Sequence, residues 1–262
     1  MTIDLINPAL IGGGLAVFMF LGILLFLALG RRLGRLAIGR GADPTTVGSL
    51  ETAVFALLGL LIAFTFAGAL SRFDGRRAQA VEEANAIGTA YLRVDLVPAA
   101  AQPKLREAFR KYVDSRLATY RKLPDIVAAR AELERSRVLQ GEIWEQAVAA
   151  TAITGVRPGT DLLLLPALNQ MFDITVVRIV ATRMHPPLVI YAMLIGLAFA
   201  AALLAGYQSA GEKVQSRVRQ IGFAVIVTFT FYVILDIEYP RLGFVRIDAI
   251  DEVLMDVRAG MK

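Results

Sequence analysis

Two carboxylates stand at the end of an uncharged apolar run near the C-terminus. Asp236 and Glu238 follow the run Gln220–Leu235 within the segment VILDIEYPR. Carboxylate oxygens at a membrane boundary can line a path for cations in an oligomer. They can equally form ion pairs that cap a helix and fix it to its neighbours. The sequence leaves both interpretations open.

The helix geometry makes these two acids costly unless something compensates them. Pro240 disfavours helical backbone at Tyr239, so both carboxylates are predicted to lie in the last helical turn. That end of a helix already carries negative partial charge. A positive partner is therefore expected, either a bound cation or one of several arginines: Arg241, Arg246, Arg72, Arg76 or Arg178.

The second apolar run carries polar residues of its own. Glu51 opens the run, where the helix dipole favours a carboxylate, and it is either a helix-start acid or an acid at a pore mouth. Thr65 lies on a face beside a stripe of small residues and could add polar lining. Small residues let helices approach closely, and the same stripe could line a narrow pore; the stripe is Thr52, Ala56, Gly59, Ala63 and Ala67.

A third group of polar residues lies in the charged middle of the chain. Asn85 follows Glu82 by three positions, and Asp173 follows Asn169 by four, so each pair shares a helix face. We expect one hydrogen-bonded cluster near the membrane, which is either a polar vestibule or cation site with oxygen ligands or a structural network. Its expected members are Glu82 or Glu83, Asn85, Asn169, Asp173 and Arg178.

Four apolar runs must position these residues, and they indicate an all-α, multi-pass membrane protein. The chain has 262 residues, is 56% hydrophobic and has a mean hydropathy of +0.58. Three runs are long enough to cross a hydrocarbon core of about 30 Å, and Gln220–Leu235 is shorter. The three long runs, of 23, 20 and 26 residues, are Pro8–Gly30, Thr52–Ser71 and Pro186–Gly211.

The composition divides the chain into four segments and predicts helices between the membrane hairpins. The segments are a first hairpin (1–71), a helical extramembrane stalk domain (72–185), a second hairpin (186–239) and a C-terminal tail (240–262). The second membrane helix is expected to continue into the stalk domain. The last stalk helix is expected to feed directly into the third membrane helix, with a kink at Pro186-Pro187. The predicted stalk helices are 72–97, 104–123, 126–152 and 161–184.

Several classes of chemistry are not indicated. The chain has no Cys and one His, so thiolate and multi-histidine metal sites are excluded. We find no nucleophile motif, phosphate loop or other cofactor motif, so we expect neither an enzyme nor a resident cofactor or metal. The net charge of +5 is assigned to loops and the membrane surface, and no nucleic-acid motif accompanies it.

Four stretches in order resemble a known family. They are ETAVFALLGLLIAFTFAGALSRFDGRR (51–77), VEEANAIGTAYLR (81–93), LPALNQMFDI (165–174) and ILDIEYPRLGFVRID (234–248). They look like the bacterial membrane proteins that carry a bestrophin-like domain of unknown function. The resemblance implies a pentameric ion channel with four membrane helices per subunit and a helical region between the second and third. No individual pore residue is implied by it.

The sequence therefore favours an oligomeric, bestrophin-like ion channel in the bacterial plasma (inner) membrane. Its expected partners are the lipid bilayer, further copies of itself and inorganic ions. The alternative is a membrane-anchored scaffold or sensor whose helical domain binds a partner and which has no pore. The basic residues on the two sides nearly balance, so the side that holds residues 72–185 stays open.

Overall fold

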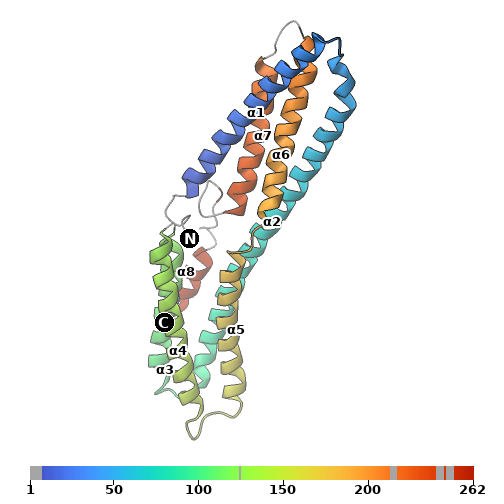
Figure 1. Ribbon diagram of the computed structural model, residues 1–262. Helices are drawn as coiled ribbons and strands as arrows, with labels where there is room; N and C mark the ends of the chain where they lie inside the picture. Colours follow the sequence, from blue (N-terminus) through green and yellow to red (C-terminus); the bar gives the residue numbers. More distant parts are fainter. Residues whose placement is uncertain (1–7, 124, 213–216, 240–244, 246–250) are drawn as a thin grey trace. The chain divides into compact units, whose positions relative to one another are not determined.

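The computed structural model describes residues 8–123, 125–212, 217–239, 245 and 251–262, and all regular secondary structure in these residues is helical (Figure 1). Eight α-helices and three short 3-10 helices follow one another in this described part of the chain. The α-helices are α1 (Pro8–Ile38), α2 (Gly48–Leu92), α3 (Gln102–Arg121), α4 (Ile126–Thr151), α5 (Thr160–Ala181), α6 (Leu188–Gln208), α7 (Arg217–Glu238) and α8 (Asp251–Gly260). The 3-10 helices are η1 (Pro44–Val47), η2 (Arg93–Leu96) and η3 (Ser209–Gly211). The predicted all-α class is confirmed.

The second apolar run continues as a helix far beyond its apolar part. Helix α2 has 45 residues, and its charged continuation from Arg72 to Leu92 follows Thr52–Ser71 without interruption. No proline lies within it, and Gly75 does not break it. The predicted continuation is confirmed.

The matching prediction for the third membrane helix is wrong. Helix α5 ends at Ala181 and α6 begins only at Leu188, so a non-helical connection replaces the expected kink. The cause is the pair Pro186-Pro187. A proline disfavours helical backbone in the residue before it and donates no backbone hydrogen bond, so two in a row separate the helices.

Among the described residues, five helices or helix runs have the length and apolar composition to cross a membrane. Four correspond to the predicted apolar runs, and the fifth is α5. Helix α5 is the least apolar of the five. It is also the most buried, because 39% of its 18-residue apolar stretch lies inside the protein.

The chain divides into two compact units. The apolar unit contains α1, α2 as far as Ser71, and the chain from His185 through α6 and α7. Within it α1 packs against α6 and α7. Glycines allow this: a Cβ added at Gly30 would overlap the carbonyl of Leu203, and one at Gly206 would overlap the carbonyl of Leu27. Close backbone contact of this kind is how membrane helices pack.

The charged unit contains Arg72–Met184 and α8. Its core is formed by the inward faces of the Arg72–Leu92 part of α2, of α3, α4 and α5, and of α8 (Figure 1). Asp125 caps α4 by accepting a hydrogen bond from the Ala128 amide at 2.9 Å, as its position before the helix suggests. The wholly buried core includes Ile87, Phe109, Tyr112, Ile143, Leu168 and Met171.

Candidate functional site

The most tightly held polar group in the described structure is the carboxylate of Glu83 in the charged unit. This side chain is completely buried. Arg116 of α3 donates from Nε to Glu83 Oε1 at 2.6 Å, and Arg178 of α5 donates from Nη1 to Oε2. The hydroxyl of Tyr120 donates to Oε2 at 3.3 Å. One carboxylate on α2 thus ties together three helices.

The Glu83 network has two guanidinium groups for one carboxylate. The Tyr120 ring helps to stabilise the extra positive charge through cation–π contacts. The Arg178 guanidinium lies 4.4 Å and that of Arg116 5.2 Å from the ring centroid. Burial alone would raise the pKa of Glu83. The two arginines outweigh that effect, so the pKa of Glu83 lies below its ordinary value and the group is ionised near neutral pH.

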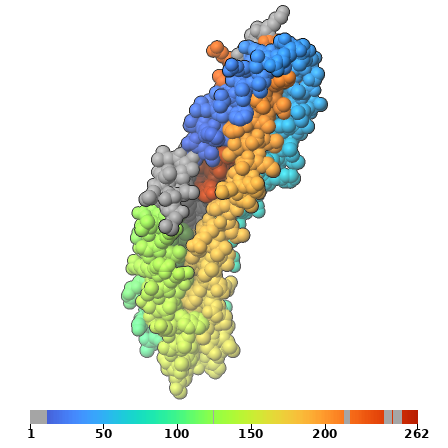
Figure 2. All heavy atoms as spheres, viewed as in Figure 1, coloured from blue at the N-terminus to red at the C-terminus, as the bar shows by residue number. Residues whose placement is uncertain are grey.

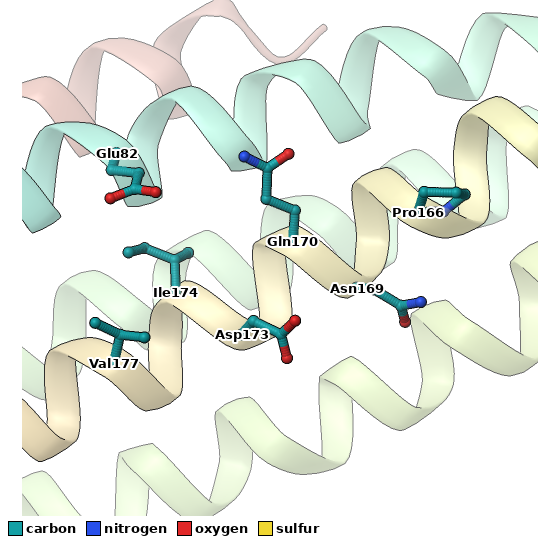
Figure 3. Close-up of a pocket in the computed structure, with 7 residues that line it drawn as sticks. All are labelled: Glu82, Pro166, Asn169, Gln170, Asp173, Ile174 and Val177. Carbon is teal, nitrogen blue, oxygen red and sulfur yellow. The ribbon is translucent and has the colours of Figure 1, made fainter.

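A groove of about 360 Å³ lies on the outside of the same unit. Glu82 of α2 lines one side, and Asn169 and Asp173 of α5 line the other. Figure 3 shows Gln170 and Ile174 pointing from α5 toward α2, whereas Asp173 and Asn169 point away from it. Pro166 and Val177 complete the lining.

The polar cluster predicted from the sequence is therefore divided between these two places. Glu83 and Arg178 meet in the core, together with Arg116, which the sequence prediction did not include. Glu82, Asn169 and Asp173 share the open groove. Asn85 is exposed and lies outside the groove lining.

Arg116 could have been found from its position on α3. It follows the buried residues Leu105, Phe109 and Tyr112 at helical spacing, so the apolar face of α3 predicts its burial. A buried arginine needs a carboxylate, and Glu83 shares the buried face of α2 with Ala80 and Ile87 at helical spacing.

The two acids that end α7 lie where the sequence placed them, in its last turn. Glu238 is completely buried and Asp236 is 8% exposed. Glu238 Oε1 lies 3.0 Å from Nδ1 of His185, and these two groups form a hydrogen bond. The His185 ring also stacks on Tyr239, with their centroids 4.5 Å apart.

One partner of Glu238 is thus a histidine, which the sequence analysis did not propose. Among the arginines considered, Arg178 is committed to Glu83. Arg76 donates to the carbonyls of Ala181 and Met184 at the end of α5. Arg241 and Arg246 lie outside the described residues.

The remaining two predicted residues belong to the apolar part of α2. Glu51 lies in the first helical turn and is partly buried. Thr65 is buried, and its hydroxyl donates to the carbonyl of Leu61 at 2.7 Å within its own helix.

The small-residue stripe of α2 faces away from the rest of its unit. All five members, Thr52, Ala56, Gly59, Ala63 and Ala67, are exposed. A Cβ added at Gly59 would meet no atom within 4 Å. The buried face of the same stretch carries Leu58, Thr65 and Ala69 instead.

The chain matches a family model and is similar to a solved structure. A family model described as the bestrophin-like domain matches residues 16–250. The chain is also similar to a crystal structure of a bacterial bestrophin homologue from Klebsiella pneumoniae, solved as a point mutant. That match has a TM-score of 0.67 at 14% sequence identity and covers 93% of this chain and 98% of the other. No curated protein matches the chain.

Proposed function

Because the chain belongs to the bestrophin-like family, we propose that it forms a homo-oligomeric ion channel in the bacterial inner membrane. The family match covers both apolar hairpins and the charged unit between them. The apolar helices support a membrane location. Ion conduction is what the resemblance to bestrophins implies, and the pentamer is taken from the same source.

The outward face of α2 carries this proposal. Within the apolar unit α2 has a buried face and two different exposed faces. One exposed face has large apolar side chains: Leu57 is 54%, Leu60 51% and Phe64 68% exposed. The other is the small-residue stripe. Its short side chains leave room beside the helix, and Thr52 contributes its hydroxyl group.

The two exposed faces of α2 suit two different surroundings. Large apolar side chains suit lipid, because the helix satisfies its own backbone polar groups and presents only hydrocarbon to the bilayer. Small residues suit a crowded axis or a close helix neighbour. In a ring of subunits, the small stripes would converge on the axis, and the lining of a narrow pore would then be methyl groups, backbone and Thr52.

The proposal assigns four membrane spans, and α5 is not one of them. Asn169, Gln170 and Asp173 are exposed near the middle of α5, where a lipid-facing span would place them in hydrocarbon. Arg178 on its inner face pairs with Glu83. Helix α5 is apolar because it covers the core of the charged unit.

The boundary acids have a supporting role in this proposal. Glu238 is held by His185 and fixes the end of α7. Asp236 and Glu51 are not completely buried, and they are the candidates for charges near an ion path, at the end of α7 and the start of α2 respectively.

Ion flux into vesicles tests the pore face directly. The chain is reconstituted as wild type, as Ala63→Phe on the small stripe, and as Leu60→Phe on the large apolar face. We expect wild-type flux, its loss in Ala63→Phe because the ring fills the narrow axis, and its retention in Leu60→Phe. Equal flux in both variants would contradict α2 as the pore helix. No flux in any of the three would contradict the channel.

A further inference from the structure

We propose that the outward face of α5 is a subunit interface, and that a second copy of this chain covers it with its α4. This inference rests on the proposed homo-oligomer and names the surface by which the charged units meet. The face lies entirely within one compact unit, so it is described without reference to the apolar unit.

The outward face of α5 has the repeat of a helix that packs against another helix. Its exposed or half-exposed positions recur at intervals of three and four residues, which keep one stripe in line. The ends of the stripe are apolar: Leu163 is 48%, Val177 46% and Val180 50% exposed. The full stripe is Leu163, Pro166, Gln170, Asp173, Val177 and Val180, all outside the core.

The middle of the stripe is acidic and hollowed. Here Glu82 and Asp173 both line the groove, and no basic side chain lines it (Figure 3). Neither acid has an ion pair with any residue in the described ranges. A partner that fits this face therefore needs apolar side chains for the ends of the stripe and a cation for its centre.

Lipid does not meet these requirements. Helix α5 has the length and composition of a span, but the groove would expose the carboxylate of Asp173 and the amides of Asn169 and Gln170 to hydrocarbon. Each such polar group costs several kcal/mol when it is left unsatisfied there. We therefore expect a protein partner, and not lipid, to cover the apolar ends of this face.

The outward face of α4 on another copy has the complementary chemistry. It exposes Val127 and Val138. Between them lie the small Ala131 and the exposed Glu134, whose carboxylate is paired with Arg137 of the same helix at 3.2 Å. Arg130 stands on this face, and within the described residues it has no ion pair. Figure 2 shows α4 and α5 uncovered and adjacent in this view, so one unit presents both halves of the contact.

A contact between α5 of one copy and α4 of the next joins two different surfaces. Contacts of this kind close into a ring when the rotation between copies is right. The same contact would repeat around a channel oligomer, with each groove receiving an arginine from its neighbour.

Photo-crosslinking tests the interface, because the chain has no cysteine of its own. Val177→Cys is labelled with a benzophenone maleimide in the reconstituted, full-length protein. Glu107→Cys on the charged outer face of α3 serves as the matched control, since its side chain is also exposed. Irradiated samples are separated on denaturing gels, and the adducts are mapped by peptide mass spectrometry.

The interface predicts that the Val177 probe doubles the mass of the labelled band and that the adduct maps to the Arg130–Val138 region. The Glu107 probe leaves a monomer band. Capture of lipid by the Val177 probe, or capture of another part of a second copy, would overturn the inference. A monomer band from an oligomer of confirmed native mass would overturn it and leave the channel proposal standing. A monomeric native mass would overturn both.

Discussion

At the scale of single residues, the contrast between Glu82 and Glu83 shows how burial decides what a carboxylate does. The two are adjacent on α2, but Glu82 faces the open groove and Glu83 is enclosed by two arginines and a tyrosine. Desolvating a charge costs several kcal/mol, and only the paired geometry repays it. Glu83 is therefore a structural residue, whereas Glu82 remains available to a partner.

We predict that Glu83→Gln destabilises the charged unit by about 3–5 kcal/mol, because it leaves Arg116 and Arg178 buried without a counter-charge. Glu82→Gln is the control, and as a surface change it should stay within about 0.5 kcal/mol. Trp144, the only tryptophan, packs against the core of this unit, so its fluorescence follows the unfolding. Equal stability of the two variants would refute the network.

The low pKa of Glu83 makes part of this stability depend on pH. A carboxyl whose pKa is lower in the folded state stabilises the fold above its unfolded value, and that contribution is lost as pH falls through the folded value. The unfolded value is about 4.5. The stability gap between wild type and Glu83→Gln should be constant from pH 7 to 5 and narrow below pH 4.5. A stability difference that widens below pH 4.5 would show that folding raises the pKa of Glu83 instead of lowering it.

At the scale of helices, close packing in the apolar unit depends on glycines at particular positions. Gly206 of α6 touches the backbone of α1 at Leu27, whereas Gly196 on the same helix has open space around its Cα. Gly30 and Gly34 of α1 likewise meet the backbone of α6, at Leu203 and Tyr207, and the sequence analysis did not propose this pairing.

We predict that Gly206→Ala lowers the melting temperature of the purified protein, because the methyl group forces α1 and α6 apart at a cost of about 1–3 kcal/mol. Gly196→Ala is the matched control. Its methyl group enters open space and alanine is the better helix former, so its melting temperature should stay equal or rise slightly. If both variants melt alike, α1 and α6 are not in backbone contact.

The helices were largely predictable from sequence because apolar runs and breakers act locally. The four apolar runs, the long continuation of α2 and the Asp125 cap all follow from neighbouring residues. The break before α6 was missed because two consecutive prolines were treated as a kink. The candidate sites were harder: Glu83 meets Arg116 and Arg178 across 33 and 95 positions, and a single sequence does not pair such distant residues.

At the scale of the whole molecule, the small-residue stripe of α2 and the outward face of α5 suggest one assembly. The small stripe of α2 would surround an axis in the membrane, and the contact between α5 and α4 would hold neighbouring charged units together. Each face lies in a different compact unit, so either contact can be removed without the other. Their shared requirement is more than one copy of the chain.

Single-channel recording of the purified wild-type protein in planar bilayers tests the central claim most directly. The channel proposal predicts discrete unitary current steps from protein of confirmed oligomeric mass. Asp236→Asn recorded beside it shows whether that boundary charge lies near the ion path, since a changed conductance or selectivity would place it there. Silent bilayers across voltage, calcium concentration and pH, from folded and oligomeric protein, would contradict ion conduction and favour a scaffold or sensor.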